Sequence, residues 1–413
     1  MVPNVLIVVL DDVGVDQVSA YGFPGSARTP VIDALAADGL RFDAMWATPT
    51  CTPTRAALMT GRVAHRTGLG AVLTLQDTGE LPLDEITLPE MLDRSGTDWT
   101  SAAIGKWHLA GPASPSGARH PLLQGFDWYS GSLNNIVRGS YVDWVRVGFD
   151  GTTGVETRFS TEAITDDAIL AWHRLREPWL LYVAYHSAHR PLMPPPDDEG
   201  LEAADERALY RANVEDADRH LGRLLRAIGP DLDETLVIVL GDNGTPAHAQ
   251  APGVPIHGSK GTMFEGGLRV PFVVAGPPVT ARGATPALAH VTDVFPTLME
   301  LAGVESVPRK LDGASLVPLF ADPAARVHEV IYTETRHPPV PPWKRASRAA
   351  RDEELKLVDR DGRRTVWRVD GFAEQRVLPA DLTPEERERL ARLRATLREH
   401  PRSARRFDEP VPE

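Results

Sequence analysis

Cysteine is nearly absent from this sequence, since Cys51 is the only one among 413 residues. A single cysteine excludes a disulfide within the chain, so nothing in the composition points to an oxidising compartment. The sequence also lacks an apolar run long enough to span a bilayer. The first strand-like segment begins near Val5, which leaves no room for a secretion signal ahead of it. We therefore expect a cytoplasmic protein that does not enter a membrane.

Positive charge is also in short supply, with 44 Lys and Arg residues against 57 Asp and Glu residues and a net charge of −13. This balance argues against a nucleic-acid partner, which usually requires a basic patch. Internal repeats and low-complexity tracts are absent as well. Apolar residues make up 42% of the chain, which is enough for a sizeable core. The length fits one large domain with a small one, or two domains.

The apolar segments that are present predict an α/β fold. Residues 4–10 form a continuous apolar, β-branched run, which is typical of a strand buried on both faces of a parallel sheet. Four similar strands are expected at 99–104, 179–185, 235–240 and 271–275. Amphipathic helices are expected between the strands, at 30–40, 161–176, 209–228 and 291–302. The sequence therefore predicts a large, mostly parallel sheet flanked by helices, with long loops over residues 111–160.

The pattern changes in the last quarter of the chain. Short strands at 329–334, 355–358 and 365–369 are joined by charged turns, and residues 383–400 form a highly charged helix. Short strands joined by turns favour an antiparallel sheet. We place a domain boundary near 325, between a large α/β domain at 1–325 and a small C-terminal α+β subdomain at 326–413.

The only cysteine lies in the segment 48–62, TPTCTPTRAALMTGR, which we interpret as a loop running into a helix. Pro53 suits the first helical turn, and Gly61 is placed to end the helix. Cys51 would then lie at a helix N-terminus, where anions are favoured, with Arg55 one turn further on. A lone cysteine is most often a small buried hydrophobe. Its polar, proline-rich surroundings here leave an activated thiolate open as an alternative.

Chemically competent residues stand at the ends of the predicted strands. They are Asp11, Asp12, Lys106, His108, His186, His189, Asp242 and Asn243. In open parallel sheets these ends meet at one edge, where ligands bind. Three carboxylates and one amide suit a hard divalent cation, and the number of oxygen ligands favours Ca²⁺ over Mg²⁺. Arg55, Lys106 and Lys260 add positive charge, which calls for an anionic substrate.

Cys51-Thr-Pro53-Thr-Arg55, followed by Leu58-Met-Thr-Gly61-Arg62, resembles the signature of the type I sulfatases of the alkaline phosphatase superfamily. Further segments resemble that family in the same order along the chain. These are the opening strand to Asp11-Asp12, Gly105-Lys-Trp-His108, Ser187-Ala-His-Arg-Pro191, Gly241-Asp-Asn-Gly244, and Lys260 with Gly266-Gly-Leu-Arg269. The C-terminal part departs from it, because Thr365–Asp370 reads TVWRVD where sulfatases often have ELYDL.

The resemblance implies a site and a mechanism. Cys51 would be oxidised to formylglycine by a formylglycine-generating enzyme, and its hydrate would be the nucleophile toward a small sulfate ester. The metal ligands would be Asp11, Asp12, Asp242, Asn243 and the modified Cys51. Arg55 would hold the formylglycine, and Lys106 and Lys260 would contact the sulfate. His108 would assist the nucleophile, and His189 would protonate the leaving oxygen.

Two alternatives to a sulfatase remain. Phosphonate monoester and phosphodiester hydrolases share the Cys-x-Pro-x-Arg motif and bind a similar tetrahedral anion. A non-catalytic protein that binds a metal or an anion could also keep the fold. The complete set of candidate ligands, acids and lysines argues against this second alternative.

Overall fold

A computed structural model describes residues 2–136, 140–198, 201 and 205–400. The strands of the main sheet are β1 (Asn4–Leu10), β2 (Leu40–Trp46), β3 (Thr100–Lys106), β4 (Trp128–Ser132), β5 (Trp144–Val147), β6 (Thr153–Glu156), β7 (Trp179–Ala184), β8 (Thr235–Gly241), β9 (Phe272–Ala275) and β10 (Gly283–His290). The helices are α1 (Pro30–Asp38), α2 (Cys51–Thr60), α3 (Ala64–Thr67), α4 (Leu88–Leu92), α5 (His120–Leu123), α6 (Ser160–Trp172), α7 (Glu206–Ile228), α8 (Glu265–Leu268), α9 (Val294–Leu301) and α10 (Pro384–Glu399).

The main sheet has ten strands in the order β10-β2-β9-β8-β1-β7-β3-β4-β5-β6. Its centre is parallel, because β1 pairs in parallel with both β7 and β8, and β3 pairs in parallel with both β7 and β4. Strand β9 runs antiparallel to β8 and β2, and β5 and β6 add an antiparallel extension beyond β4. The predicted α/β fold with a mostly parallel sheet is confirmed.

Helices cover both faces of this sheet, and successive side chains of β1 point alternately into the core on one face and the core on the other. Val5, Ile7 and Val9 pack into one core, together with residues of α2, α4 and α9. Leu6, Val8 and Leu10 point to the opposite face and pack with residues of α1, α6 and α7. A strand that is buried on both faces needs apolar residues at every position, which explains the unbroken apolar run at 4–10.

Residues 111–160 correct one prediction. We expected long loops, whereas the structure places β4, β5 and β6 there and extends the sheet by three strands. The WYSGS sequence of β4 resembles a loop because of its glycine and serines. Gly131 is required at this point, because a Cβ atom there would lie 1.9 Å from the carbonyl oxygen of Gly105 on the neighbouring strand. Tight strand pairing, and not a turn, explains this glycine.

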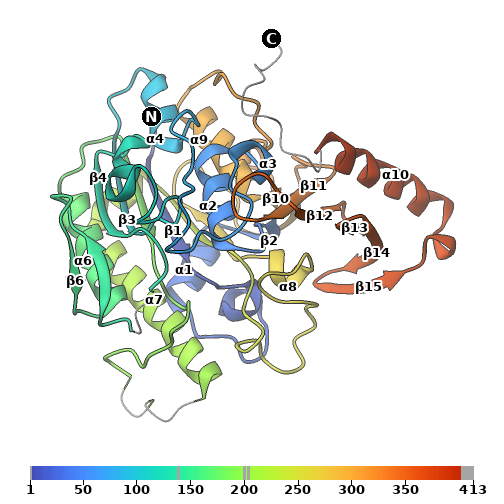
Figure 1. Ribbon diagram of the computed structural model, residues 1–413, viewed down its shortest axis with the longest axis horizontal. Helices are drawn as coiled ribbons and strands as arrows, with labels where there is room; N and C mark the ends of the chain where they lie inside the picture. The colour runs from blue at the N-terminus through green and yellow to red at the C-terminus, as the bar shows by residue number, and fades with distance from the viewer. Residues whose placement is uncertain (1, 137–139, 199–200, 202–204, 401–413) are drawn as a thin grey trace.

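The C-terminal sheet is a separate antiparallel meander of five strands, β11 (Ile331–His337), β12 (Arg345–Arg351), β13 (Leu355–Arg360), β14 (Arg363–Asp370) and β15 (Ala373–Val377). Figure 1 shows it beside the main body, with α10 across one face. Leu390, Leu393 and Leu397 of α10 pack on Leu355 and Leu357 of the sheet. The predicted antiparallel sheet is therefore confirmed, with five strands where three were expected. The boundary near 325 stays a prediction, and residues 401–413 of the expected subdomain lie outside the described residues.

Among the described residues, no helix is both long and apolar enough to cross a membrane.

Candidate active site

Cys51 is the first residue of α2, as the sequence predicted. Pro53 lies in the first turn, and Gly61 ends the helix in the left-handed conformation with φ of 67°. The loop before the helix is fixed by Thr54, whose hydroxyl oxygen accepts the backbone N–H of Thr48 at 3.1 Å. Every residue of α2 is buried, so the helix holds the Cys51 side chain inside the protein at the edge of the sheet.

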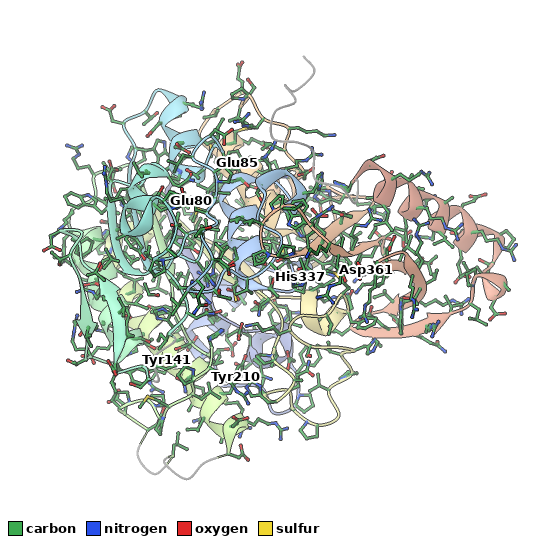
Figure 2. The ribbon with its side chains drawn as sticks, viewed as in Figure 1. Glu80, Glu85, Tyr141, Tyr210, His337 and Asp361 are labelled. Carbon is green, nitrogen blue, oxygen red and sulfur yellow. The ribbon has the colours of Figure 1, made fainter. Side chains whose placement is uncertain are left out.

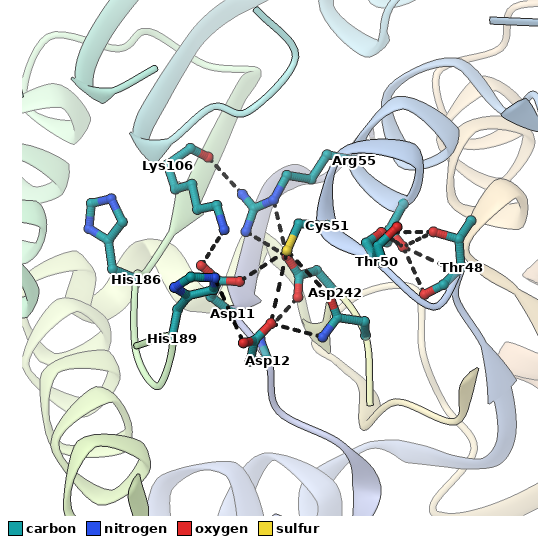
Figure 3. A network of polar contacts seen from close by, with 12 residues as sticks. Asp11, Asp12, Thr48, Thr50, Cys51, Arg55, Lys106, His186, His189 and Asp242 are labelled. Carbon is teal, nitrogen blue, oxygen red and sulfur yellow. Dashed lines mark hydrogen bonds and ion pairs between the residues drawn. The ribbon is translucent and has the colours of Figure 1, made fainter. Parts of the chain in front are cut away.

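The oxygen ligands that the sequence predicted converge on Cys51 (Figure 3). Asp11 and Asp12 follow β1, and Asp242 and Asn243 follow its parallel neighbour β8, where Leu10 pairs with Gly241. The Cys51 Sγ atom lies 3.6 Å from Asp11 Oδ1, 3.9 Å from Asp12 Oδ1 and 3.4 Å from Asn243 Oδ1. One ligand atom from each of Asp11, Asp12, Cys51 and Asp242 lies within 4.8 Å of the others.

Asp12 adopts an unusual backbone conformation to reach this position. Its φ is 64°, in the left-handed region that aspartate tolerates better than most residues. The Asp12 backbone N–H donates to Asp242 Oδ1 at 3.0 Å, and the Tyr210 hydroxyl donates to the Asp12 carbonyl at 2.6 Å. Backbone strain of this kind persists only where surrounding contacts enforce it, and it occurs often at functional sites.

Each carboxylate of the site has its own cation. Lys106 Nζ pairs with Asp11, and Lys260 Nζ pairs with Asp12. Arg55 donates two hydrogen bonds to Asp242 Oδ2, at 3.1 Å from Nε and 2.9 Å from Nη2. Three cations balance three carboxylates, so the protein part of this cluster carries no net charge.

The electrostatic surroundings fix the protonation of two groups. Burial alone would raise the pKa of Asp11, but the nearby Lys106, His189 and Arg55 outweigh it and hold that pKa well below its usual range. Burial, followed by the Asp242 carboxylate, raises the pKa of the Cys51 thiol. The unmodified thiol is therefore protonated near neutral pH, which argues against the alternative of an activated thiolate.

His189 and His108 make different contacts beside this cluster. The His189 Nδ1–H donates to the Arg190 carbonyl, and its Nε2 atom lies 3.9 Å from Asp12 Oδ2. The His108 Nε2–H donates to the Leu73 carbonyl at 3.0 Å. A carbonyl can only accept, so the free lone pair of His108 is on Nδ1, which is buried without a hydrogen-bond partner among the described residues. Burial, together with Lys106 and Arg55, lowers the pKa of His108 well below its usual value.

His186, whose role the sequence left open, has a supporting position. Ser132 donates its hydroxyl proton to the Asn134 carbonyl at 2.7 Å, so it accepts a hydrogen bond from the His186 Nε2–H at 2.6 Å. Burial and the charge of Lys106 lower the pKa of His186 to about 3. A histidine that is neutral at physiological pH has no extra proton to give, so His186 is a poor candidate for the acid.

Three tyrosines that position the site were not identified from the sequence. Tyr210 holds the Asp12 carbonyl, as described above. The Tyr141 hydroxyl lies 2.7 Å from the carbonyl of His189 and 3.0 Å from that of His186. Arg55 donates to the Tyr182 hydroxyl at 3.3 Å. Tyr141 and Tyr210 are labelled in Figure 2. Tyr182 lies within an apolar strand and Tyr210 within a helix, where a tyrosine is typical of a core position, and Tyr141 lies in a turn, so sequence alone could not single these out.

The fold and this cluster define a class of enzyme whose members hydrolyse anionic esters at the edge of an α/β sheet, and comparison with known proteins gives the family. The Sulfatase family profile matches residues 3–304, and the profile of the N-sulphoglucosamine sulphohydrolase C-terminal region matches residues 257–374. The chain therefore belongs to the sulfatase family. The predicted family and enzyme class, a sulfuric ester hydrolase, are confirmed.

Individual relatives agree with this assignment. Arylsulfatase A of Bos taurus is 32% identical over 381 residues, covering 81% of this chain and 71% of its own length. Human N-acetylgalactosamine-6-sulfatase is 33% identical over 358 residues, covering 76% of this chain and 65% of its own length. Among solved structures, Ps i-CgsB has a TM-score of 0.79 at 25% identity, over 97% of this chain and 92% of that one. The PsFucS1 sulfatase of Pseudoalteromonas sp. shares the fold with a TM-score of 0.76, at 23% identity over 97% of this chain and 90% of that one.

Proposed function

We propose that this protein hydrolyses sulfate esters with a formylglycine nucleophile made from Cys51 by a separate formylglycine-generating enzyme. The observation that supports the proposal most strongly is the position of Cys51. Its Sγ atom lies at a helix N-terminus, among three oxygen ligands and 3.8 Å from Lys260 Nζ. After conversion, oxygen atoms would occupy the space that Sγ occupies here, and the hydrate would supply the attacking hydroxyl.

The residues of the site also fit a divalent cation, for which we propose Ca²⁺. Asp11, Asp12, Asp242 and the Asn243 amide oxygen are hard ligands, which Ca²⁺ and Mg²⁺ prefer. The cation would polarise the nucleophile and the sulfate oxygens. Because the three carboxylates are already balanced by Lys106, Lys260 and Arg55, a bound cation would make the site positive overall. A positive site is what binding of a sulfate group requires.

The protein groups around the sulfate take distinct roles in this proposal. Lys106 and Lys260 contact the sulfate oxygens, and Arg55 orients the modified residue. His189 gives a proton from Nε2 to the departing alcohol, since its Nδ1 is already engaged by the Arg190 carbonyl. His108 would remove the proton of the second hydroxyl of the hydrate through Nδ1, so that the C–O bond to sulfate breaks, sulfate leaves and the aldehyde returns. This nitrogen is left free and neutral by the Leu73 carbonyl and by burial.

The test compares ester classes on one preparation. Protein coexpressed with a formylglycine-generating enzyme should turn over 4-nitrophenyl sulfate with a higher kcat/KM than the matching phosphonate monoester or phosphodiester. Cys51→Ala, prepared in the same way, is the control for contaminating activity. A higher kcat/KM for the phosphonate monoester or the phosphodiester would transfer the proposal to that class. Absence of turnover of all three by formylglycine-bearing protein would favour a non-catalytic role. The cytoplasmic location stays a prediction.

A further inference from the structure

A pocket of about 420 Å³ lies next to the site and has no role in the chemistry described so far. Its wall is formed by the segment after β4, by β5 and by the loop around Leu75, and includes Leu133, Ile136, Trp144 and Val147. The volume falls within the range of small-molecule sites, roughly 300–1,000 Å³. We propose that this pocket binds the alcohol portion of the ester and selects an uncharged, largely apolar alcohol. This inference rests on the proposed ester hydrolysis.

Two walls of the pocket also hold the proposed base, which links the pocket to the chemistry. The His108 backbone N–H donates to the Leu133 carbonyl at 3.0 Å, and the His108 side chain donates to the Leu73 carbonyl, two residues before Leu75. On the other side, the Trp144 ring lies edge-on to His186 at 5.4 Å between centroids. Because Lys106 pairs in register with Ser132, which lines the pocket, the pocket lies at the carboxyl end of these strands, as the sulfate site does.

The chemistry of the lining favours an apolar alcohol. None of the described residues that line the pocket is charged, and most are apolar, including one indole ring. A sulfated or carboxylated sugar would bring a second negative charge into this lining and leave it unpaired, which is unfavourable. The many hydroxyl groups of a sugar would likewise find few partners. An aromatic or alicyclic ring that packs against Trp144 has no hydrogen bonds to water that it must give up.

The experiment uses two aryl sulfates of the same shape, 4-acetylphenyl sulfate, which is neutral at its far end, and 4-carboxyphenyl sulfate, which is anionic there. Wild-type enzyme should prefer the acetyl compound by about tenfold or more in kcat/KM. Leu75→Arg places a cation at the rim of the pocket and should reduce this preference by about tenfold. Leu75 is 36% exposed, so the substitution is compatible with folding. Val155→Ala, at a 67% exposed position on the strand next to β5, is the control and should leave the preference unchanged.

The outcomes separate this inference from the proposed function. If phosphonate monoesters of these alcohols are cleaved and sulfates are not, sulfatase function fails, and the pocket is judged by the same ratios on the phosphonates. If wild-type enzyme prefers the carboxyphenyl ester or a sulfated monosaccharide, the inference is wrong. It is equally wrong if Leu75→Arg leaves the ratio unchanged, because the alcohol would then bind elsewhere.

Discussion

Glu265 joins the two sheets, and its removal should weaken the whole fold. The side chain is fully buried at the start of α8, and it pairs with Arg269 in the main domain. Arg351 Nη1 on β12 lies 2.7 Å away, and Lys356 Nζ on β13 lies 2.9 Å away. Glu265→Gln keeps the shape of the side chain and removes its charge, so three buried cations lose their shared carboxylate.

The size of the effect follows from these contacts. Glu374 still pairs with Lys356 at 2.9 Å, but the two arginines keep only neutral partners in this cluster. Breaking a buried ion pair from one side typically costs about 3–5 kcal/mol. We expect a loss in this range in the free energy of unfolding, measured by urea titration. Intrinsic tryptophan fluorescence suits the assay, because Lys356 Nζ lies 4.7 Å from the centroid of the Trp46 ring.

Glu353→Gln provides a matched control. It removes a carboxylate that pairs with Arg326, where the side chains are 47% and 72% exposed, and exposed pairs contribute about 0–1 kcal/mol. The Glu265 variant should therefore lose several times more stability than the control. A loss below about 1 kcal/mol for Glu265→Gln, equal to the control, would refute the reasoning that this buried network joins the sheets.

Three further predictions concern pH, metal and the acid. Burial alone would raise the pKa of Glu265, but Arg351, Lys356 and Arg269 hold that pKa well below its usual range. The ionised Glu265 side chain therefore stabilises the folded protein at pH values above the unfolded-state pKa of about 4.3, and this stabilisation is lost as pH falls through the folded-state pKa. The stability gap between wild type and Glu265→Gln should therefore shrink below about pH 4 in urea titrations, and a constant gap would contradict this. Removing divalent cations with a chelator should lower both turnover and melting temperature, both restored by Ca²⁺, because a ligand bound only by the native state stabilises it; unchanged values in both would exclude the metal. His189→Ala should slow the hydrolysis of alkyl sulfates far more than that of nitrophenyl sulfates. The measurement is kcat/KM of wild type and variant over leaving groups of graded pKa, and an unchanged slope of kcat/KM against leaving-group pKa would exclude His189 as the acid.

Much of the site could be predicted from the sequence because its residues follow buried strands directly. Asp11 and Asp12 after β1, and Asp242 after β8, are fixed by parallel pairing that the apolar runs already predict. Their distances could not be predicted, nor could the pairing of each carboxylate with one cation. The position of His108 on the Leu73 carbonyl depends on a loop that carries no sequence signal.

Strands with atypical composition were missed because tertiary contacts, and not local preference, form them. Strand β10 contains Pro286, which is tolerated because β10 is the edge strand of the main sheet. Strand β12 reads RASRAAR, with no β-branched or aromatic residue. Arg348 and Arg351 on β12 are held by Asp359 and Glu265, contacts that appear only once the chain is folded. Propensity therefore predicts a helix or a loop where packing selects a strand.

The proposed nucleophile is the central claim, and one measurement tests it directly. Preparations coexpressed with different amounts of a formylglycine-generating enzyme would differ in the fraction of Cys51 converted, which peptide mass spectrometry over residues 48–62 quantifies. Turnover of 4-nitrophenyl sulfate per mole of protein should rise in proportion to the converted fraction and extrapolate to zero without conversion. Full turnover by protein whose Cys51 is still a thiol would contradict the account.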